Sequence, residues 1–301
     1  MFPGVVPRPH SMVKLGPDVE NDTTDAYSGY IQVGQIYGFS MMHESGTGGA
    51  PKYGVVSQMG VVGIPANPLL DLGQNRSVKD TAEVGYYKSS LASGITVELA
   101  ATAHAGMYQY SFPSGNNAVV VDVSHVLKSF RGLGWSQGYA GGAFELTKNG
   151  YKGYGIYNGG WNVAPNWRIY FCGHFDQQPT SIKTFTGHNE TLSSYDSTTS
   201  TKGRIRQGGV FGFNISTVTS RIGISFISSE KACSNVAAEI PEGTALQDLV
   251  NDAQESWNSD ILRKFITTET NTTVLQQLYS YLYGANLIPS NREYCTVWNC
   301  I

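Results

Sequence analysis

Charged residues are scarce in this 301-residue chain: Asp, Glu, Lys and Arg make up 14% of it, where about a quarter is usual. The 20 basic and 23 acidic residues leave a net charge of −3. Binding to a phosphate backbone requires a positive patch or stripe, and no basic run is present here. We therefore expect no nucleic-acid partner.

Long hydrophobic runs are also missing. No stretch reaches the roughly 18 consecutive apolar residues of a membrane-spanning helix. The first ten residues, MFPGVVPRPH, lack the basic and apolar regions of a signal peptide. We predict neither a membrane span nor a targeting signal in the chain as given.

Cysteine is limited to positions 172, 233, 295 and 300. Their spacing does not fit a zinc site, because no second close pair and no nearby histidine completes a ligand set. Cys172 lies in an apolar run and Cys233 follows another. We expect both to be buried free thiols, with a disulfide as the alternative.

Glycine (35) and tyrosine (18) are abundant, and 41% of the residues are hydrophobic. Short β-branched and aromatic runs separated by Gly, Asn and Ser are typical of an antiparallel β-sandwich. The predicted strands are residues 95–101, 107–112, 118–123, 138–147, 151–157, 166–171, 209–213 and 221–227. Less regular strands are expected at residues 12–15, 37–41 and 55–62.

Two connections between strands have distinct patterns. Asn149 and Gly150 both tolerate positive φ and predict a tight hairpin. The Ser- and Thr-rich stretch between Phe185 and Gly209 is expected to be an exposed loop without a strand of its own.

Helical periodicity appears after residue 234. Apolar residues recur at helical spacing over residues 244–265, with Gly243 and Thr244 as the expected start. A second amphipathic helix is predicted over residues 272–283 behind a Thr cap. The fold class expected is therefore mainly β: a large antiparallel sandwich followed by C-terminal linker helices.

Five sequons begin at Asn21, Asn75, Asn189, Asn214 and Asn271. They are compatible with N-glycosylation, although chance alone gives roughly three in a chain this rich in Ser and Thr. Together with the low charge, they favour a secretory history for the parent protein.

Four stretches, in this order and spacing, resemble the N-terminal domain of a fungal glycoside hydrolase family 92 α-mannosidase. They are FPGVVPRP (residues 2–9) with MVKLGPD (12–18), GFSMMHESGTGG (38–49), ELAATAHAGMYQY (98–110) and RIGISFISSEKACSN (221–235). Pro9, His10, Ser11 and Met12 depart from the family's usual Pro-Phe-Gly-Met, which affects the pocket expected near His10.

The resemblance implies a galactose-mutarotase-like supersandwich over residues 1–235 and a helical linker over 236–291. Residues 292–301 are expected to be a truncated, divergent start of an (α/α)6 catalytic barrel that is otherwise missing. A truncated or mis-spliced gene product would explain this ending. The family's implied activity is calcium-dependent, inverting, exo-acting hydrolysis of α-mannosides at the ends of N-glycans or mannan, by a secreted parent enzyme.

An inverting glycosidase uses a carboxylic acid and a carboxylate about 6.5–9.5 Å apart. In this family both, and most calcium ligands, come from the barrel. We therefore expect no catalytic residue and no bound cofactor within this chain, and partners limited to mannose-containing glycans and the barrel itself.

The candidate sugar-binding residues are His43, Glu44, Ser45 and Gly46 in one Gly-rich loop, because Gly lets the backbone approach a ligand closely. His104 is a candidate through the resemblance, with a satisfied core histidine as the alternative. Trp161 and Asn162 offer a stacking surface and an amide, or else a core tryptophan at a strand end.

Other titratable residues are given no catalytic role. His125, His174 and His188 have no partner at metal or triad spacing and are expected to be structural or exposed. The acidic pairs Asp22/Asp25 and Glu239/Glu242 are interpreted as a loop pair and as a linker pair preceding a helix, where acidic side chains favour the helix dipole.

Three functions follow as hypotheses. The first is an inactive remnant of an α-mannosidase with half of its substrate pocket. The second is a carbohydrate-binding module with weak affinity, because half a pocket buries little of a ligand. The third is an interaction domain whose exposed apolar helix faces bind a partner.

Overall fold

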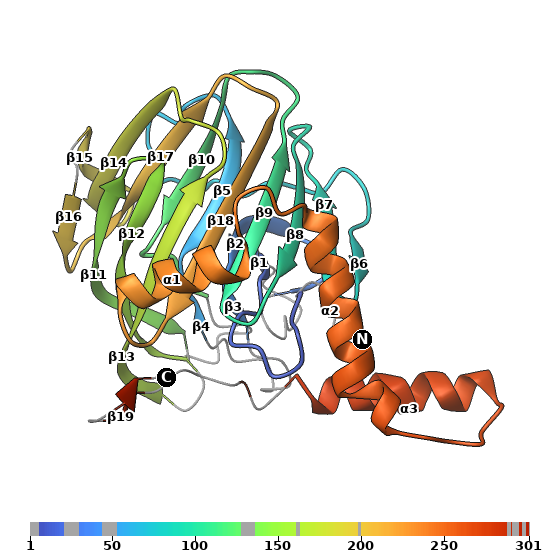
Figure 1. The fold of residues 1–301 in the computed structure, drawn as a ribbon. Helices are drawn as coiled ribbons and strands as arrows, with labels where there is room; N and C mark the ends of the chain where they lie inside the picture. The colour runs from blue at the N-terminus through green and yellow to red at the C-terminus, as the bar shows by residue number, and fades with distance from the viewer. Residues whose placement is uncertain are drawn as a thin grey trace.

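The computed structural model describes residues 6–20, 30–43, 53–127, 136–160, 163–197, 200–287, 290, 295–296 and 299–300. In these residues two large antiparallel sheets pack face to face, and helices follow them in the chain (Figure 1). The predicted fold class, an antiparallel sandwich followed by C-terminal helices, is confirmed.

The first sheet has seven strands. Their spatial order is β1 (Gly16–Glu20), β2 (Gln35–Ser40), β5 (Ser57–Val62), β10 (Asn117–Asp122), β17 (Arg206–Phe213), β14 (Ser181–His188) and β15 (Thr191–Asp196). β10 is central and pairs with β5 on one side and β17 on the other over its whole length. This sheet therefore joins β1, β2 and β5, from the first part of the chain, to β14, β15 and β17, which come much later in the sequence.

The second sheet has nine strands. Their order is β16 (Ser200–Gly203), β11 (Gln137–Thr147), β12 (Gly150–Gly159), β13 (Ala164–Phe175), β18 (Thr217–Ser225), β9 (Ala105–Ser111), β8 (Thr96–Ala101), β7 (Tyr86–Ser90) and β6 (Thr81–Glu83). Two short hairpins complete the description: β3 (Met42–His43) with β4 (Tyr53–Gly54), and β19 (Cys295–Thr296) with β20 (Asn299–Cys300).

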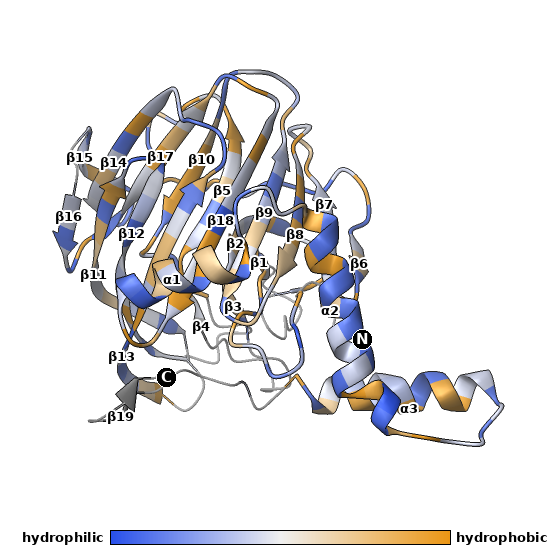
Figure 2. Cartoon of the chain, in the orientation of Figure 1, coloured by the Kyte–Doolittle hydropathy of each residue, from blue (hydrophilic) through white to orange (hydrophobic). Residues whose placement is uncertain are grey.

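The main core fills the space between the sheets, because alternate side chains of a strand point to opposite faces. On β9, Tyr108 and Tyr110 point into this core, whereas Ala105 and Met107 face the helices. Aromatic rings from the two sheets meet at its centre: Phe175 lies 4.8 Å from Phe211, centroid to centroid. Hydrophobic positions recur along the strands of both sheets (Figure 2).

The helices cover one face and one end of the nine-stranded sheet. α1 (Ser229–Glu239) packs across β18 and β13, and α2 (Leu246–Asp260) lies beside β8 (Figure 1). A Cβ on Gly85 would lie 2.6 Å from that of Ala253, so α2 contacts the β6–β7 turn directly. The short 3-10 helix η3 (Leu262–Lys264) and α3 (Thr272–Ala285) follow.

Some predicted element boundaries were wrong. α1 was not predicted. Residue 235, the expected end of the sandwich domain, lies within α1, and the domain boundary itself stays a prediction. The stretch expected to be a loop forms β15, β16 and part of β14 and β17. Ser and Thr suit a strand with one solvated face, and exposure alternates along β15, so polarity here marks the edge of a sheet.

The predicted hairpin is present, but its two-residue turn is Lys148–Asn149, since Thr147 pairs with Gly150. Neither Asn149 nor Gly150 has the positive φ that motivated the prediction. Both predicted helices are present with different caps. The backbone of Ala245 donates to Asp248 at the start of α2, and the side chain of Asn271 caps α3. Residues 12–15 precede β1 and are not a strand.

The expectation of free thiols at Cys172 and Cys233 is wrong. The two residues form a disulfide that joins β13 to α1, 61 residues apart in sequence. The disulfide was only the alternative in the sequence analysis, because α1 was not anticipated. Without that helix, nothing in the pattern placed Cys233 over the sheet.

Candidate functional site

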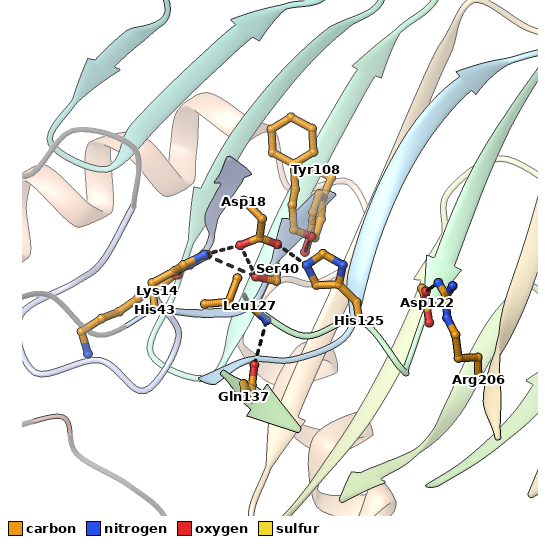
Figure 3. Close-up of polar contacts among 11 residues, drawn as sticks. Lys14, Asp18, Ser40, His43, Tyr108, Asp122, His125, Leu127, Gln137 and Arg206 are labelled. Atoms are coloured by element: carbon orange, nitrogen blue, oxygen red, sulfur yellow. Dashed lines mark hydrogen bonds and ion pairs between the residues drawn. The ribbon is translucent and has the colours of Figure 1, made fainter. Parts of the chain in front are cut away.

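A buried polar cluster surrounds Asp18 and includes the candidate residue His43. Asp18 on β1 is fully buried, and so is the side chain of His43 on β3. One carboxylate oxygen of Asp18 accepts hydrogen bonds from His43 Nε2 at 2.7 Å and Ser40 Oγ at 2.9 Å. The other accepts from His125 Nε2 at 2.8 Å. Figure 3 shows the three side chains around the carboxylate.

The charge of this cluster is set by opposing effects on Asp18. Burial raises the pKa of the carboxyl, but the charge and hydrogen bonds of His125 and His43 outweigh it and lower the pKa to about 2. Asp18 is therefore ionised at neutral pH. It is unsuited to proton transfer there, because its carboxylate is both inaccessible to substrate and weakly basic.

His43 is held from both sides of its ring. Nδ1 contacts the carbonyl oxygen of Lys14 at 2.7 Å, and Nε2 contacts Asp18. Both partners are acceptors, so both nitrogens are occupied. A direct hydrogen bond from His43 to a sugar would require one of these contacts to open. These two contacts fix the position of the His43 ring at the end of β3.

The segment before β1 connects this cluster to the second predicted histidine. The backbone N–H of Lys14 donates to Met41, while those of Met12 and Val13 donate to the carbonyl of Ala103 at 3.0 and 3.1 Å. The Lys14 ammonium is buried and donates to the carbonyl of Ser11 and to the hydroxyl of Ser290. Residues 12–14 therefore link β3 to the turn that carries His104.

His104 is held by a carboxylate from α1. Its ring Nδ1 lies 2.6 Å from Glu239 Oε1, and its backbone N–H donates to Oε2 of the same residue at 2.8 Å. Burial raises the pKa of Glu239, but the hydrogen bonds from His104 and Thr102 outweigh it and lower the pKa. The interpretation of Glu239 as a residue preceding a helix was wrong, because it is the last residue of α1.

The remaining candidates, Glu44, Ser45, Gly46, Trp161 and Asn162, lie outside the described residues, as do Asp22 and Asp25. Of the described candidates, His43 and the turn that carries His104 both contact the segment at residues 12–14.

Sequence reasoning missed the residues that organise this region. Asp18 was part of a family stretch without a role, and His125 had no partner at a recognisable spacing. Residues 18, 43 and 125 meet only because β1, β3 and the end of β10 converge. The one signal available in the sequence was the position of Asp18 within a run of residues that is otherwise buried. A buried carboxylate needs a partner, so such a position indicates a polar contact.

The described ranges contain no group of three or more His, Cys, Asp or Glu side chains that could hold a metal ion. These residues do not fit a calcium site, and no ligand is assigned among them. In the same part of the chain, no helix combines the length and hydropathy of a membrane span.

Comparison with known proteins decides the family. The sequence matches the glycosyl hydrolase family 92 N-terminal domain over residues 1–225 and the catalytic domain of the same family over residues 231–296. The chain belongs to glycosyl hydrolase family 92. The family resemblance found in the four sequence stretches is confirmed.

Relatives of the chain are longer than the chain itself. An uncharacterized secreted glycosidase of Arthroderma benhamiae is 28% identical over 290 residues, which cover 86% of this chain and 36% of that protein. A family 92 α-mannosidase from Bacteroides thetaiotaomicron superposes with a TM-score of 0.80 at 22% identity, covering 97% of this chain and 39% of the mannosidase.

A second family 92 enzyme from Bacteroides thetaiotaomicron, an inverting mannosidase, superposes with a TM-score of 0.74 at 24% identity, covering 96% of this chain and 37% of that one. At these identities the superpositions show a shared fold. The chain spans less than two fifths of the length of these relatives.

Proposed function

We propose that this chain is the sandwich part of an exo-acting α-mannosidase, where it forms one wall of the substrate pocket. The observation that carries the proposal is the pair of family matches, to the N-terminal domain over residues 1–225 and to the catalytic domain over residues 231–296. A related α-mannosidase structure contains mannoimidazole, which supports mannose-type sugars as the ligand class. The substrates would be mannose termini of N-glycans or mannan.

The pocket wall would consist of His43, Glu44, Ser45 and Gly46, with His104, Trp161 and Asn162 nearby. The contacts of His43 support a division of roles within the loop. Because both ring nitrogens are bonded, His43 would position the loop, and the residues after it would contact the sugar. Only a rearranged His43 could itself bind a hydroxyl group.

The chain alone would not hydrolyse mannosides. An inverting mechanism needs one acid to protonate the leaving oxygen and one base to activate water. The carboxylates of Asp18 and Glu239 at the candidate site are already bonded to histidines. The acid, the base and most calcium ligands would come from the barrel, with the sandwich at residues 1–235, a linker at 236–291 and the barrel beginning at 292.

The α2–α3 corner is the surface that would contact this barrel. A cavity of about 310 Å³ between Val84, Leu262 and α3 is lined mainly by apolar side chains, including Leu275 and Tyr279. Tyr281 on α3 is 73% exposed, and Ile266 in the preceding loop is 95% exposed. An exposed apolar surface of this kind is typical of an interface.

We also place the parent protein in the secretory pathway. The disulfide between Cys172 and Cys233 is typical of proteins that fold in an oxidising compartment. The secreted relative from Arthroderma benhamiae supports the same location.

The test is a mannosidase assay on the purified chain with calcium, using an aryl α-mannoside and an α-1,2-linked mannobiose. We expect no product above background together with a cooperative thermal melt. Release of mannose that heat denaturation abolishes would contradict the proposal, since it would mean that an acid and a base lie within these residues.

A further inference from the structure

A second pocket opens on the outer face of the seven-stranded sheet. On β10, Val119 and Val121 point into the core between the sheets, whereas Val120 and Asp122 line this pocket. Its volume is about 480 Å³, within the range of small-ligand sites. The loop of residues 68–72 and the β14–β15 turn form two adjoining walls of the pocket.

The floor of the pocket is held in place by Arg206. One guanidinium nitrogen donates to the carbonyls of Leu69 and Asn189 at 2.8 and 2.9 Å, and the other donates to Asp122 Oδ2 at 2.9 Å. The second oxygen of Asp122 accepts from the backbone of Ser124. Because Arg206 joins both walls to β10, the pocket exists before any ligand binds. Figure 3 shows Arg206 beside Asp122.

The lining combines carboxylates with an aromatic ring and aliphatic side chains. Asp71 and Glu190 are exposed at the rim, Tyr37 contributes a ring, and Met59 and Leu72 contribute apolar surface. Carboxylates accept hydrogen bonds from hydroxyl groups, and the ring offers a face for C–H groups. The carboxylates of Asp71, Asp122 and Glu190 outnumber the single guanidinium of Arg206. This excess of negative charge disfavours an anionic ligand.

We propose that this pocket binds a neutral saccharide unit at a site separate from the loop of residues 44–46. The inference does not depend on the proposed pocket wall, because the two sites share no lining residue. His125 connects them: its ring lies 5.2 Å from that of Tyr37, and its Nε2 binds Asp18. A ligand beside Tyr37 therefore perturbs the cluster that holds His43.

The saccharide can come from solution or from the chain itself. Asn189 lines the pocket, begins the sequon Asn189-Glu190-Thr191 and is exposed in the β14–β15 turn. A glycan attached to its side-chain nitrogen would place a sugar at the rim. Both sources share the chemistry of a neutral pyranose.

The first experiment uses unglycosylated, isotope-labelled chain from bacteria, titrated with methyl α-mannoside and α-1,2-mannobiose by NMR. We expect the amide signals of Tyr37, Asp71, Glu190 and His125 to shift. The double variant Asp71→Asn/Glu190→Gln should bind at least about tenfold more weakly, because the loss of even one hydrogen bond to a charged group has an effect of that size. Glu230→Gln, which changes an exposed carboxylate on α1, should leave binding unchanged.

Absence of shifts at these residues would overturn the inference, as would equally strong binding of mannose 6-phosphate. Shifts confined to residues 44–46 and 161–162 would overturn it while supporting the proposed pocket wall. Shifts confined to the outer pocket would support it independently of that wall. Thermal melts of both variants establish that they are folded.

The second experiment separates the two sources. Chain secreted from yeast is compared with its Asn189→Gln variant in the same titration. If the chain's own glycan occupies the pocket, only the variant should respond to soluble sugar. If both respond equally, the ligand comes from solution.

Discussion

A single carboxylate organises the region around the candidate loop. Asp18 is fully buried, and its carboxylate accepts hydrogen bonds from two imidazole rings and a hydroxyl group. Removing a charge from such a cluster leaves its partners buried without an acceptor, which costs more than the loss of an exposed ion pair.

We predict that Asp18→Asn lowers the free energy of unfolding by about 3 kcal/mol, the cost of breaking a buried ion pair. Urea denaturation followed by tryptophan fluorescence measures this change. Asp260→Asn, at an exposed position near the end of α2, is the matched control and should change little. Equal effects of the two substitutions would show that the cluster does not contribute to stability.

The same residue makes stability depend on pH. Its pKa falls from an ordinary 3.8 to about 2 in the folded protein, so the unfolded chain takes up the proton first as pH falls. The stabilisation, about 2 kcal/mol, is complete above pH 4 and is lost as pH falls toward 2. Unfolding free energies at pH 5 and pH 2 should therefore differ less for Asp18→Asn than for the unmodified chain. If the unfolding free energies of the two proteins differed by the same amount at pH 5 and at pH 2, the prediction would be contradicted.

At the scale of elements, short runs rich in β-branched and aromatic residues allowed most of the sandwich to be predicted. Residues 118–123 and 209–213 are two such runs, and they overlap β10 and β17. β15 and β16 were missed because their polar side chains match a loop in composition. α1 was missed because its buried residues are few, namely Ala232, Asn235 and Val236.

The candidate site was less predictable than the fold. Glycine content led to the prediction of a loop at residues 43–46, and its sugar-binding role stays a prediction. Asp18 and His125, which do meet in the structure, are 107 residues apart. Their contact depends on how strands of one sheet are ordered, which local patterns do not encode. Likewise, the bond between His104 and Glu239 required α1 to be in place.

The disulfide fixes α1 to β13, and we predict that Cys172→Ala lowers the free energy of unfolding by about 4 kcal/mol, as expected for a loop of this length. Chemical denaturation of Cys172→Ala, Cys233→Ala and the double variant provides the measurement. Either single substitution should cost as much as both together, because each removes the same bond. Additive losses would show that the two residues act independently.

At the scale of the whole molecule, the last helix is attached to the sandwich at one end. The ring of Tyr283 lies 4.3 Å from that of Trp257, whose indole nitrogen donates to the carbonyl of Pro7 at 3.0 Å. The rest of α3 extends away from the sheets (Figure 1).

We predict that Tyr283→Ala lowers the free energy of unfolding by about 3 kcal/mol, as for other buried aromatic residues. The matched substitution is Tyr281→Ala, on the same helix but at a position that is 73% exposed. It should change the free energy of unfolding by less than about 0.5 kcal/mol. Thermal and urea denaturation of both variants test the difference. A comparable loss in Tyr281→Ala would mean that the exposed face of α3 is already covered, for example by a second copy of the chain.

The contacts at the two ends of the fold also limit the order of events during synthesis. Pro7 is bound by Trp257, and the backbone of His10 donates to the carbonyl of Asn286. A ribosome adding about 5–20 residues per second needs some 15–60 s to make the chain between these partners. Throughout that interval Pro7 and His10 have been synthesised without these partners. The first described residues of the chain can therefore reach their final contacts only after translation has passed the last helix.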